Sequence, residues 1–504
     1  QEDPADPLYS SSRTGGPMQS QREDDLAHLL RRAGFGAASS ELSEYARLGF
    51  LGFNTAVAHF VNYGVQPDDV DGLIGRPGYA GVTAQGQFLP AANINDARQR
   101  WLFRMIHSRR PLQEKMALFW HNHFATAYSK IAGSVGATEA TRMLAAKPSE
   151  DAGGVKGQLE LFREHALGNF RDLLVAVAKD PAMLYWLDGR TNVRAHPQEN
   201  FARELMELFT IGVDTFTEAD VYAGARVFTG WNLARPGAGA AQRYEFSYVA
   251  AQHDTTAKEF SFPIYQGGGR VIPARAPAAG IEDGLDLINA LVRHPAAGPR
   301  LALKLYRFFV NEVDAPDTAL IDELAGIYYA RNYEIEPMVR RLLLSPQFRD
   351  TSNHFKRFAW PVEFAVRAIK EVGWTGFSVN DALSPLVNMG QQLLEPPDVN
   401  GWELGRGWFS TGAMLARMNF AAQIATNQKF NLRDVFRGQA NTPDALVGQA
   451  LLRLSAPEYG ARERSALIDY VSAGGAWTAS DAQLAAKGSG LVHLIVASGE
   501  YQLI

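Results

Sequence analysis

The chain has 504 residues, of which 46% are hydrophobic and 11% aromatic, and its formal net charge is −5. This composition supplies a sizeable hydrophobic core and differs from that of disordered or fibrous proteins. The small negative charge provides no basic surface for nucleic acid, and no apolar run reaches the roughly 18 residues that cross a bilayer. We therefore expect a globular protein with neither a nucleic-acid partner nor a membrane span.

The start of the chain bears on the compartment, whereas its lack of cysteine limits the chemistry and does not decide the compartment. The first residue is Gln1 rather than Met, and no cysteine is present. We expect that an export signal before Gln1 has been removed, which predicts a periplasmic or secreted protein; a trimmed chain end is the alternative explanation. The absence of cysteine excludes disulfides, thiolate zinc sites and thiol catalysis.

The first part of the chain predicts a leader followed by helices. Residues 1–20 are rich in Pro, Ser, Gly and Asp, which is typical of a flexible segment. Residues 64–93 are rich in Gly and Pro and are expected to form a loop. Helical periodicity and capping residues predict helices over 24–34, after Ser39, over 94–109 and over 111–123.

Helical periodicity continues in the middle of the chain, with one interruption. The expected helices cover 156–186, 198–212, 217–229, 281–296, 298–311, 316–331, 334–344 and 360–373. Residues 232–280 instead hold Gly-rich stretches and short alternating runs, which predict an irregular or β-hairpin insertion. The fold class is therefore mainly α: a large multi-helix domain over 21–425 that contains this insertion. A helical C-terminal extension over 426–504 is expected to pack on it.

The strongest chemical signal is an acidic stripe on the helix expected over 198–209. At 100° per residue, Asn200, Glu204 and Glu207 fall within about 60° of one another. An ordinary amphipathic helix with a solvated face would show the same pattern. Two neighbouring carboxylates can also perform general acid–base catalysis or bind a cation.

Three further residues around this stripe complete a candidate site. Arg203 lies beside the stripe and would keep a neighbouring carboxylate ionised. Asp188 and Asn192 precede the helix and could contribute a third acid and an amide.

A pair of histidines forms the second candidate cluster. On a regular helix from Pro111, His123 faces the same side as Met116 and Phe119, whereas His121 points about 160° away. Two histidines in this relation do not bind one metal unless the helix has ended. We expect His123 to be a buried or pocket group and His121 to make a different contact, with acid–base catalysis as the functional interpretation.

The remaining candidates are a polar cluster in the insertion and two tryptophans. His253, Asp254 and Lys258 could cover a cleft as a lid, or form an exposed polar loop. Trp231 and Trp402 could be stacking platforms for sugar rings, or fill the joints between helical layers.

These motifs resemble those of the bacterial DUF1800 family, in which they occur in the same order over roughly residues 24–425. The motifs are Leu29–Gly36, Phe119–Phe124, Glu199–Leu205, Thr229–Trp231, His253–Asp254 with Lys258, and Pro396–Trp402. The resemblance implies an α-rich exported protein, and family members are often encoded near DUF1501 proteins, which implies a DUF1501-type partner. It implies no established activity. Some relatives carry His where this chain has Phe209, which weakens a metal-site interpretation.

Three functions remain as hypotheses. The first is a hydrolase that acts on an extracellular or envelope polymer, such as a polysaccharide or an oligosaccharide derived from it, and that needs no cofactor. Its catalytic residues would be Glu204, Glu207, Asp188, His123, His121 and Arg203. Its substrate-binding residues would be Asn200, Asn192, Trp231, His253, Asp254, Lys258 and Trp402.

The other two hypotheses use the same residues differently. In a metal-dependent oxidoreductase or metalloprotein, the acids of 198–209 and the histidines of 121–123 would bind a divalent metal within a helical bundle. In a non-enzymatic envelope scaffold or binding protein, the polar network would only fix the fold.

Overall fold

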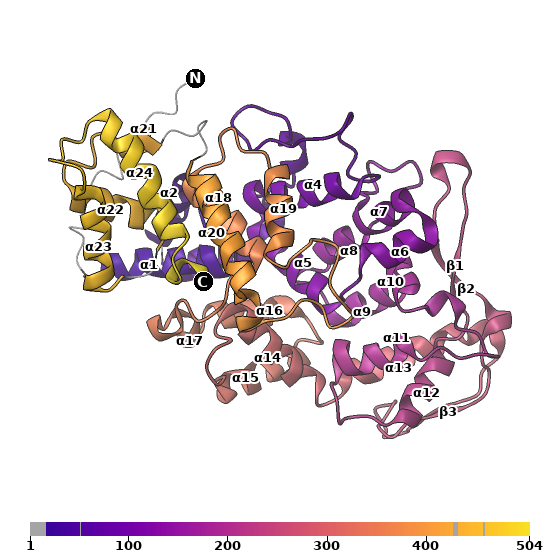
Figure 1. Cartoon of the computed structure of the whole chain (residues 1–504). Coiled ribbons are helices and arrows are strands. Elements are labelled where there is room, and N and C mark those ends of the chain that lie inside the picture. The colour runs from indigo at the N-terminus through magenta and orange to yellow at the C-terminus, as the bar shows by residue number, and fades with distance from the viewer. Residues whose placement is uncertain (1–16, 51, 427–431, 457–458) are drawn as a thin grey trace.

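Helices dominate the structure. The computed structural model describes residues 17–50, 52–426, 432–456 and 459–504, and within these ranges it contains 24 α-helices and two antiparallel sheets of two strands each (Figure 1). The mainly α fold with a small strand-containing insertion is confirmed. None of the described helices is both long enough and apolar enough to cross a membrane.

The helices fall into two series, before and after the insertion. Those before it are α1 (Pro17–Arg32), α2 (Ser39–Phe50), α3 (Phe53–Val61), α4 (Ile94–His107), α5 (Pro111–His123), α6 (Tyr128–Val135), α7 (Ala137–Ala145), α8 (Gln158–Glu164), α9 (Phe170–Ala178), α10 (Pro181–Trp186), α11 (Asn200–Glu204) and α12 (Glu218–Val227). Those after it are α13 (Ile281–Arg293), α14 (Ala297–Phe309), α15 (Thr318–Ala330), α16 (Ile335–Leu343), α17 (Pro346–Arg349), α18 (Pro361–Val372), α19 (Asn380–Asn388), α20 (Thr411–Ala425), α21 (Leu432–Phe436), α22 (Pro443–Arg453), α23 (Ala461–Ser472) and α24 (Asp481–Val496).

Both sheets lie between α12 and α13. The strands β1 (Trp231–Ala234) and β2 (Glu245–Tyr248) form a hairpin in which Trp231 is opposite Tyr248. The strands β3 (Lys258–Glu259) and β4 (Val271–Ile272) form a shorter pair. The hairpin lies at the end of the molecule that also holds α6, α7 and α10 (Figure 1).

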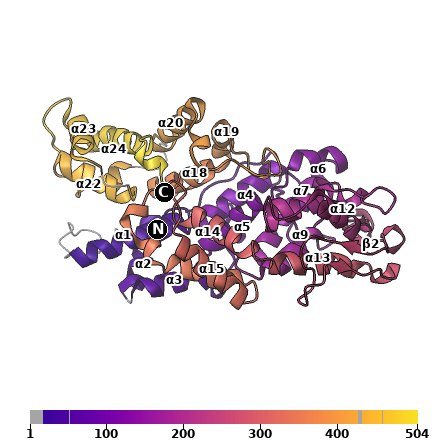
Figure 2. The same cartoon turned by 90° about the horizontal axis from the view of Figure 1, so that it is seen from below.

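The N-terminal and C-terminal helices lie together at the other end of the molecule (Figures 1 and 2). Arg31 of α1 donates a hydrogen bond to the carbonyl of Ser455 at 3.4 Å. Arg367 of α18 donates to the carbonyls of Leu454 and Tyr501, at 3.1 and 3.2 Å. Residues beyond 425 are therefore bonded to α1 and α18, two helices of the region before 425. The domain boundary at 425 stays a prediction.

Two helix boundaries differ from those expected. The leader expected over 1–20 lies mostly outside the described residues, and α1 already begins at Pro17. The helix expected over 156–186 is divided into α8, α9 and α10. The breaks occur because the side chains of Asn169 and Asp180 accept hydrogen bonds from backbone N–H groups and so cap new helices.

The cap of α10 is also a buried carboxyl group. Asp180 is buried, and one of its oxygens accepts hydrogen bonds from Met183 N at 2.9 Å and from the Gln158 side chain at 2.8 Å. Burial raises the pKa of Asp180 to about 7, against the effect of these hydrogen bonds.

The raised pKa of Asp180 gives a prediction about stability. Its stabilising contribution is complete below the unfolded pKa of about 3.9 and is lost as the pH rises to the folded value of about 7. Asp180→Asn keeps the acceptor and does not ionise. The variant should therefore be more stable than the wild type at pH 9, by up to about 4 kcal/mol in the free energy of unfolding, and nearly equal to it at pH 4. Chemical denaturation at both pH values measures this, and parallel pH profiles for the two proteins would contradict it.

Candidate active site

The acidic stripe lies on an unusual helix. The helix expected over 198–212 is α11 followed by a π-helix, Leu205–Thr210, in which the N–H of Ile211 bonds the carbonyl of Met206 at 2.9 Å, five residues back. Such turns contain one extra residue and occur frequently at functional sites. Glu204 is the last residue of α11, and Glu207 lies in the π-helix.

The two carboxylates of this helix are half-buried and free of partners. Within the described ranges, no hydrogen bond or ion pair engages the side chain of Glu204 or Glu207. Burial raises the pKa of the Glu204 carboxyl, and the negative charge of Glu207 raises it further, while Arg203 opposes both effects. One carboxyl of the pair is thus held toward its protonated form by its environment, which is a common property of catalytic acids.

Asp188 and Asn200 extend this acidic stripe. Asp188 follows α10 with a left-handed backbone (φ 59°). Its Oδ2 lies 3.2 Å from the Lys130 ammonium of α6 and accepts a hydrogen bond from the Asn200 side chain at 3.3 Å. Asn200 precedes Glu204 by one helical turn. We call Lys130, Asp188, Asn200, Glu204 and Glu207 the polar row.

Two other residues expected in the site are bonded elsewhere. Arg203 forms a two-point ion pair with Glu218 of α12, at 2.9 and 2.7 Å, and also contacts Glu199 at 3.3 Å. Asn192 is buried, where it donates to the carbonyl of Ala225 and accepts from the backbone N–H of Gln198. The geometry favours a supporting part for both residues, and their roles in binding or catalysis stay predictions.

His123 lies beneath the π-helix and bonds to it. Its Nε2 donates to the carbonyl of Phe209 at 3.0 Å, and its Nδ1 accepts from the Lys304 ammonium of α14 at 2.9 Å. Burial and the neighbouring Lys304 hold the pKa of His123 well below its usual range. Burial also lowers the pKa of Lys304 to about 7. His123 is therefore a neutral imidazole in contact with the helix that carries the acids.

His121 occupies a different environment from His123. It is fully buried, with its ring centroid 5.4 Å from that of Trp101 and 5.3 Å from that of Trp402. Burial lowers its pKa to about 3. No hydrogen bond or ion pair within the described ranges joins it to His123 or to the polar row. In the part of the chain that the structure describes, no three His, Asp or Glu side chains are grouped as metal ligands.

The two tryptophans are inside the protein. Trp231 is 1% exposed and stacks edge-on against Phe228, and Trp402 is 4% exposed. The prediction that they are stacking platforms for sugar rings is wrong for this conformation, because neither ring face reaches the surface. Both rings instead fill joints between elements, which was the alternative.

The loop that carries Trp402 is bonded to the end of α5. The backbone N–H of Trp402 donates to the Asn122 side chain at 2.8 Å. Gly401 has a φ of +85°, and a Cβ atom at this position would lie 2.4 Å from the same Asn122 oxygen. At the other end of the loop, the carbonyl of Leu394 accepts from Tyr128 N at 2.9 Å. The Phe119–Phe124 motif and the Pro396–Trp402 motif are therefore in direct contact in the structure.

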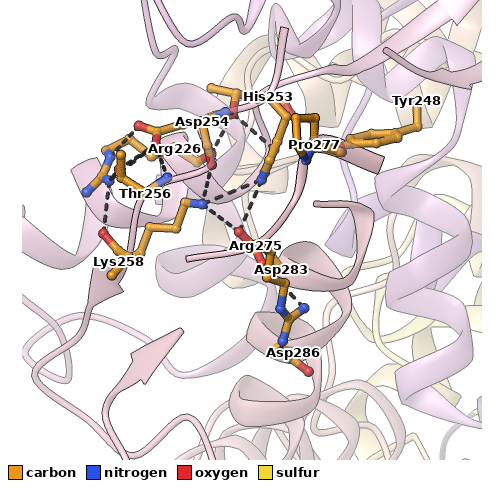
Figure 3. Close-up of polar contacts among 12 residues, drawn as sticks. Arg226, Tyr248, His253, Asp254, Thr256, Lys258, Arg275, Pro277, Asp283 and Asp286 are labelled. Atoms are coloured by element: carbon orange, nitrogen blue, oxygen red, sulfur yellow. Dashed lines mark hydrogen bonds and ion pairs between the residues drawn. The ribbon is translucent and has the colours of Figure 1, made fainter. Parts of the chain in front are cut away.

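The cluster in the insertion is buried and centres on a residue that the sequence analysis missed. Asp283 of α13 accepts from the Lys258 ammonium at 2.5 Å, and the Nε2 of His253 lies 3.1 Å from the same oxygen (Figure 3). All three side chains are almost fully buried. Asp283 looks like an ordinary acid in the first turn of a helix, so the sequence offers no signal that singles it out.

Two further bonds complete this cluster. The Nδ1 of His253 donates to the carbonyl of Thr229 at 2.8 Å. Asp254 forms an ion pair with Arg226 at 2.7 Å (Figure 3). His253 and Lys258 form neither the lid nor the exposed polar loop that we expected. Their polar atoms bond to other groups inside the protein. The cluster joins α12, the insertion and α13.

Comparison with known proteins identifies the family. A family model described as "Protein of unknown function (DUF1800)" matches residues 28–503. The match extends beyond the region of motif resemblance and includes most of the C-terminal helices. No curated protein and no solved structure matches the chain.

The contact between Gly401 and Asn122 is open to a direct test. Gly401→Ala should lower the free energy of unfolding by about 1–2 kcal/mol through its left-handed backbone, and by a further 1–3 kcal/mol through the clash with Asn122. Gly405→Ala is the matched control, because Gly405 also has a positive φ (+69°) and a Cβ there would meet its nearest atom only at 4.0 Å. Chemical denaturation measures both variants. Equal losses would show that the joint with Asn122 does not constrain the loop.

Proposed function

The chain belongs to the DUF1800 family, whose description assigns no activity, and we propose that it is an exported hydrolase of an extracellular or envelope polymer such as a polysaccharide. The observation that carries this proposal is the pair Glu204 and Glu207. Two half-buried carboxylates without partners within the described ranges lie at the end of α11 and in the π-helix that follows it, and the environment of Glu204 favours its protonated form. Pairs of carboxyl groups whose environments separate their pKa values are typical of glycoside hydrolysis.

The proposed chemistry assigns each carboxyl a role. Glu204 donates its proton to the leaving oxygen as the bond from this oxygen to the sugar carbon breaks. Glu207, ionised, adds to that carbon, and water then hydrolyses the intermediate while Glu204 accepts a proton. This two-step scheme is that of a retaining enzyme, so it requires retention of configuration at the reacting carbon.

The rest of the polar row supports a hydroxyl-rich substrate. Asp188, Asn200 and Lys130 present a carboxylate, an amide and an ammonium beside Glu204, and these groups bind hydroxyls through hydrogen bonds. His123 and Arg203 do not contact the substrate in this proposal. They hold neighbouring groups in place.

A cavity at the opposite end of α10 from Asp188 supports a polymeric substrate. It has a volume of about 210 Å³ and is lined by residues that include Pro181 at the start of α10, Tyr244 just before β2, and Phe246 of β2. Asp188 follows the other end of α10, a helix of six residues that is about 9 Å long at 1.5 Å per residue. A chain of several sugar units could occupy both places at once.

Substitution of the two acids tests the proposal. Glu204→Gln and Glu207→Gln should each lower the rate at which reducing ends are released from bacterial envelope polysaccharides by about 10²–10⁴-fold. The matched control is Glu199→Gln, because Glu199 lies on the same segment and only pairs with Arg203. All three variants should keep the wild-type free energy of unfolding within about 1 kcal/mol.

Other outcomes separate the competing hypotheses. Unchanged turnover in both Gln variants, or loss of folding in both, would contradict the proposal and favour a scaffold. A stoichiometric metal in the purified protein, lost together with activity in these variants, would favour the metalloprotein.

A further inference from the structure

Three consecutive carbonyl groups at the end of the π-helix each accept a hydrogen bond from a side chain of another helix. Arg300 of α14 donates to the carbonyl of Glu207 at 2.9 Å. Lys304 of α14 donates to that of Leu208 at 3.3 Å, and His123 of α5 donates to that of Phe209 at 3.0 Å. We call Arg300, Lys304 and His123 the carbonyl clamp.

The end of a helix needs such donors. The last carbonyls of a helix have no partner within it and carry a partial negative charge. Here the helix ends inside the protein, because Phe209 and Thr210 are buried. The side chains of Arg300 and Lys304 and the neutral imidazole of His123 supply the missing bonds. Two of these side chains are four residues apart on α14 and therefore share one face of that helix.

Two members of the carbonyl clamp, Lys304 and His123, bond to each other, and the third, Arg300, packs closely against Gly212. Lys304 also donates to the Nδ1 of His123 at 2.9 Å, so the imidazole presents the N–H on Nε2 to the carbonyl of Phe209. Gly212 follows the π-helix with a φ of +84°, and a Cβ atom there would lie 2.9 Å from the Arg300 guanidinium. Only glycine leaves the guanidinium this space.

We propose that the carbonyl clamp is a positioning device, which fixes the π-helix so that Glu204 and Glu207 are held at a defined separation and half-burial. Arg300, Lys304 and His123 are positioning residues: they bond the backbone of Glu207, Leu208 and Phe209 and do not touch the substrate. The catalytic part of this inference rests on the proposed hydrolase, whereas the restraint on the π-helix does not.

Removal of one donor tests the restraint. Lys304→Met keeps the length of the side chain and loses the N–H donors. The amides of Ile211 and Gly212, which bond the carbonyl of Met206 at 2.9 and 3.0 Å, should then exchange hydrogen about tenfold faster. The matched control is Arg307→Met, because Arg307 is exposed on the same helix and should leave exchange at these two amides unchanged.

A second pair of variants distinguishes positioning from a general loss of structure. Arg300→Ala should accelerate the same two amides, and it should lower kcat on the cleaved polymer about tenfold or more while KM stays within about twofold. Arg300→Lys keeps a donor and should restore both quantities in part. If Lys304→Met does not fold, the Arg300 pair decides the question.

The outcomes for the clamp and for the hydrolase are separable. Wild-type exchange at Ile211 and Gly212 in both Lys304→Met and Arg300→Ala would overturn the clamp, whatever the activity. Faster exchange with unchanged kcat would overturn its positioning role. If the wild type cleaves no polymer, the proposed function fails, and the exchange rates alone decide whether the clamp restrains the π-helix.

Discussion

A buried backbone carbonyl must have a hydrogen-bond donor, and this constraint shapes the candidate site. The π-helix ends at the buried residues Phe209 and Thr210, so its last carbonyls take donors from the protein. Side chains from α5 and α14 meet the requirement, and in doing so they join three segments that are about ninety residues apart in the sequence. Glu207 belongs to this π-helix and Glu204 directly precedes it, so the bonds to these carbonyls restrain the segment that carries the acids.

The same logic explains why so many motif residues are not at the surface. His253, Lys258 and Asp283 satisfy one another between α12 and α13 (Figure 3). Asn122 serves as the acceptor for the loop of Trp402. A buried polar group costs free energy unless it is hydrogen-bonded. A fold in which such groups connect helices therefore tolerates few other residues at these positions. The density of motifs in this sequence reflects the assembly of the fold as well as its chemistry, and the proposed function uses the acids of the polar row.

The sequence predicted elements whose signals are local. Thr217 and Asp220 form the capping box that starts α12, and Pro111 occupies the first turn of α5. The alternating run at Tyr244–Tyr248 marks β2. The single helix expected over 156–186 is divided in the structure, because Asn169 and Asp180 cap new helices within one continuous apolar pattern. Periodicity gave no warning of the π-helix, since its extra residue changes the register only after Leu205.

The site was predictable only where one helix carries it. The spacing of Asn200, Glu204 and Glu207 predicts a common face, and in the structure the charge of Glu207 acts on Glu204 while Asn200 bonds to Asp188; the role of these residues as a site stays a prediction. Lys304 and Asp283 were not identifiable, because each meets its partners through contacts between helices far apart in the chain. The inward face of His123 followed from periodicity, whereas its bond to Phe209 required the fold.

The central claim is that Glu204 and Glu207 act as a coupled pair, and a carboxyl titration of Glu204 tests it most directly. The pKa of Glu204 can be followed by NMR with 13C-labelled glutamate, assigned by comparison with Glu204→Gln. The account requires a pKa above the ordinary range of a glutamate in the wild type, and a lower pKa in Glu207→Gln, because the second charge raises it. An ordinary pKa that does not change when Glu207 is neutralised would contradict the account.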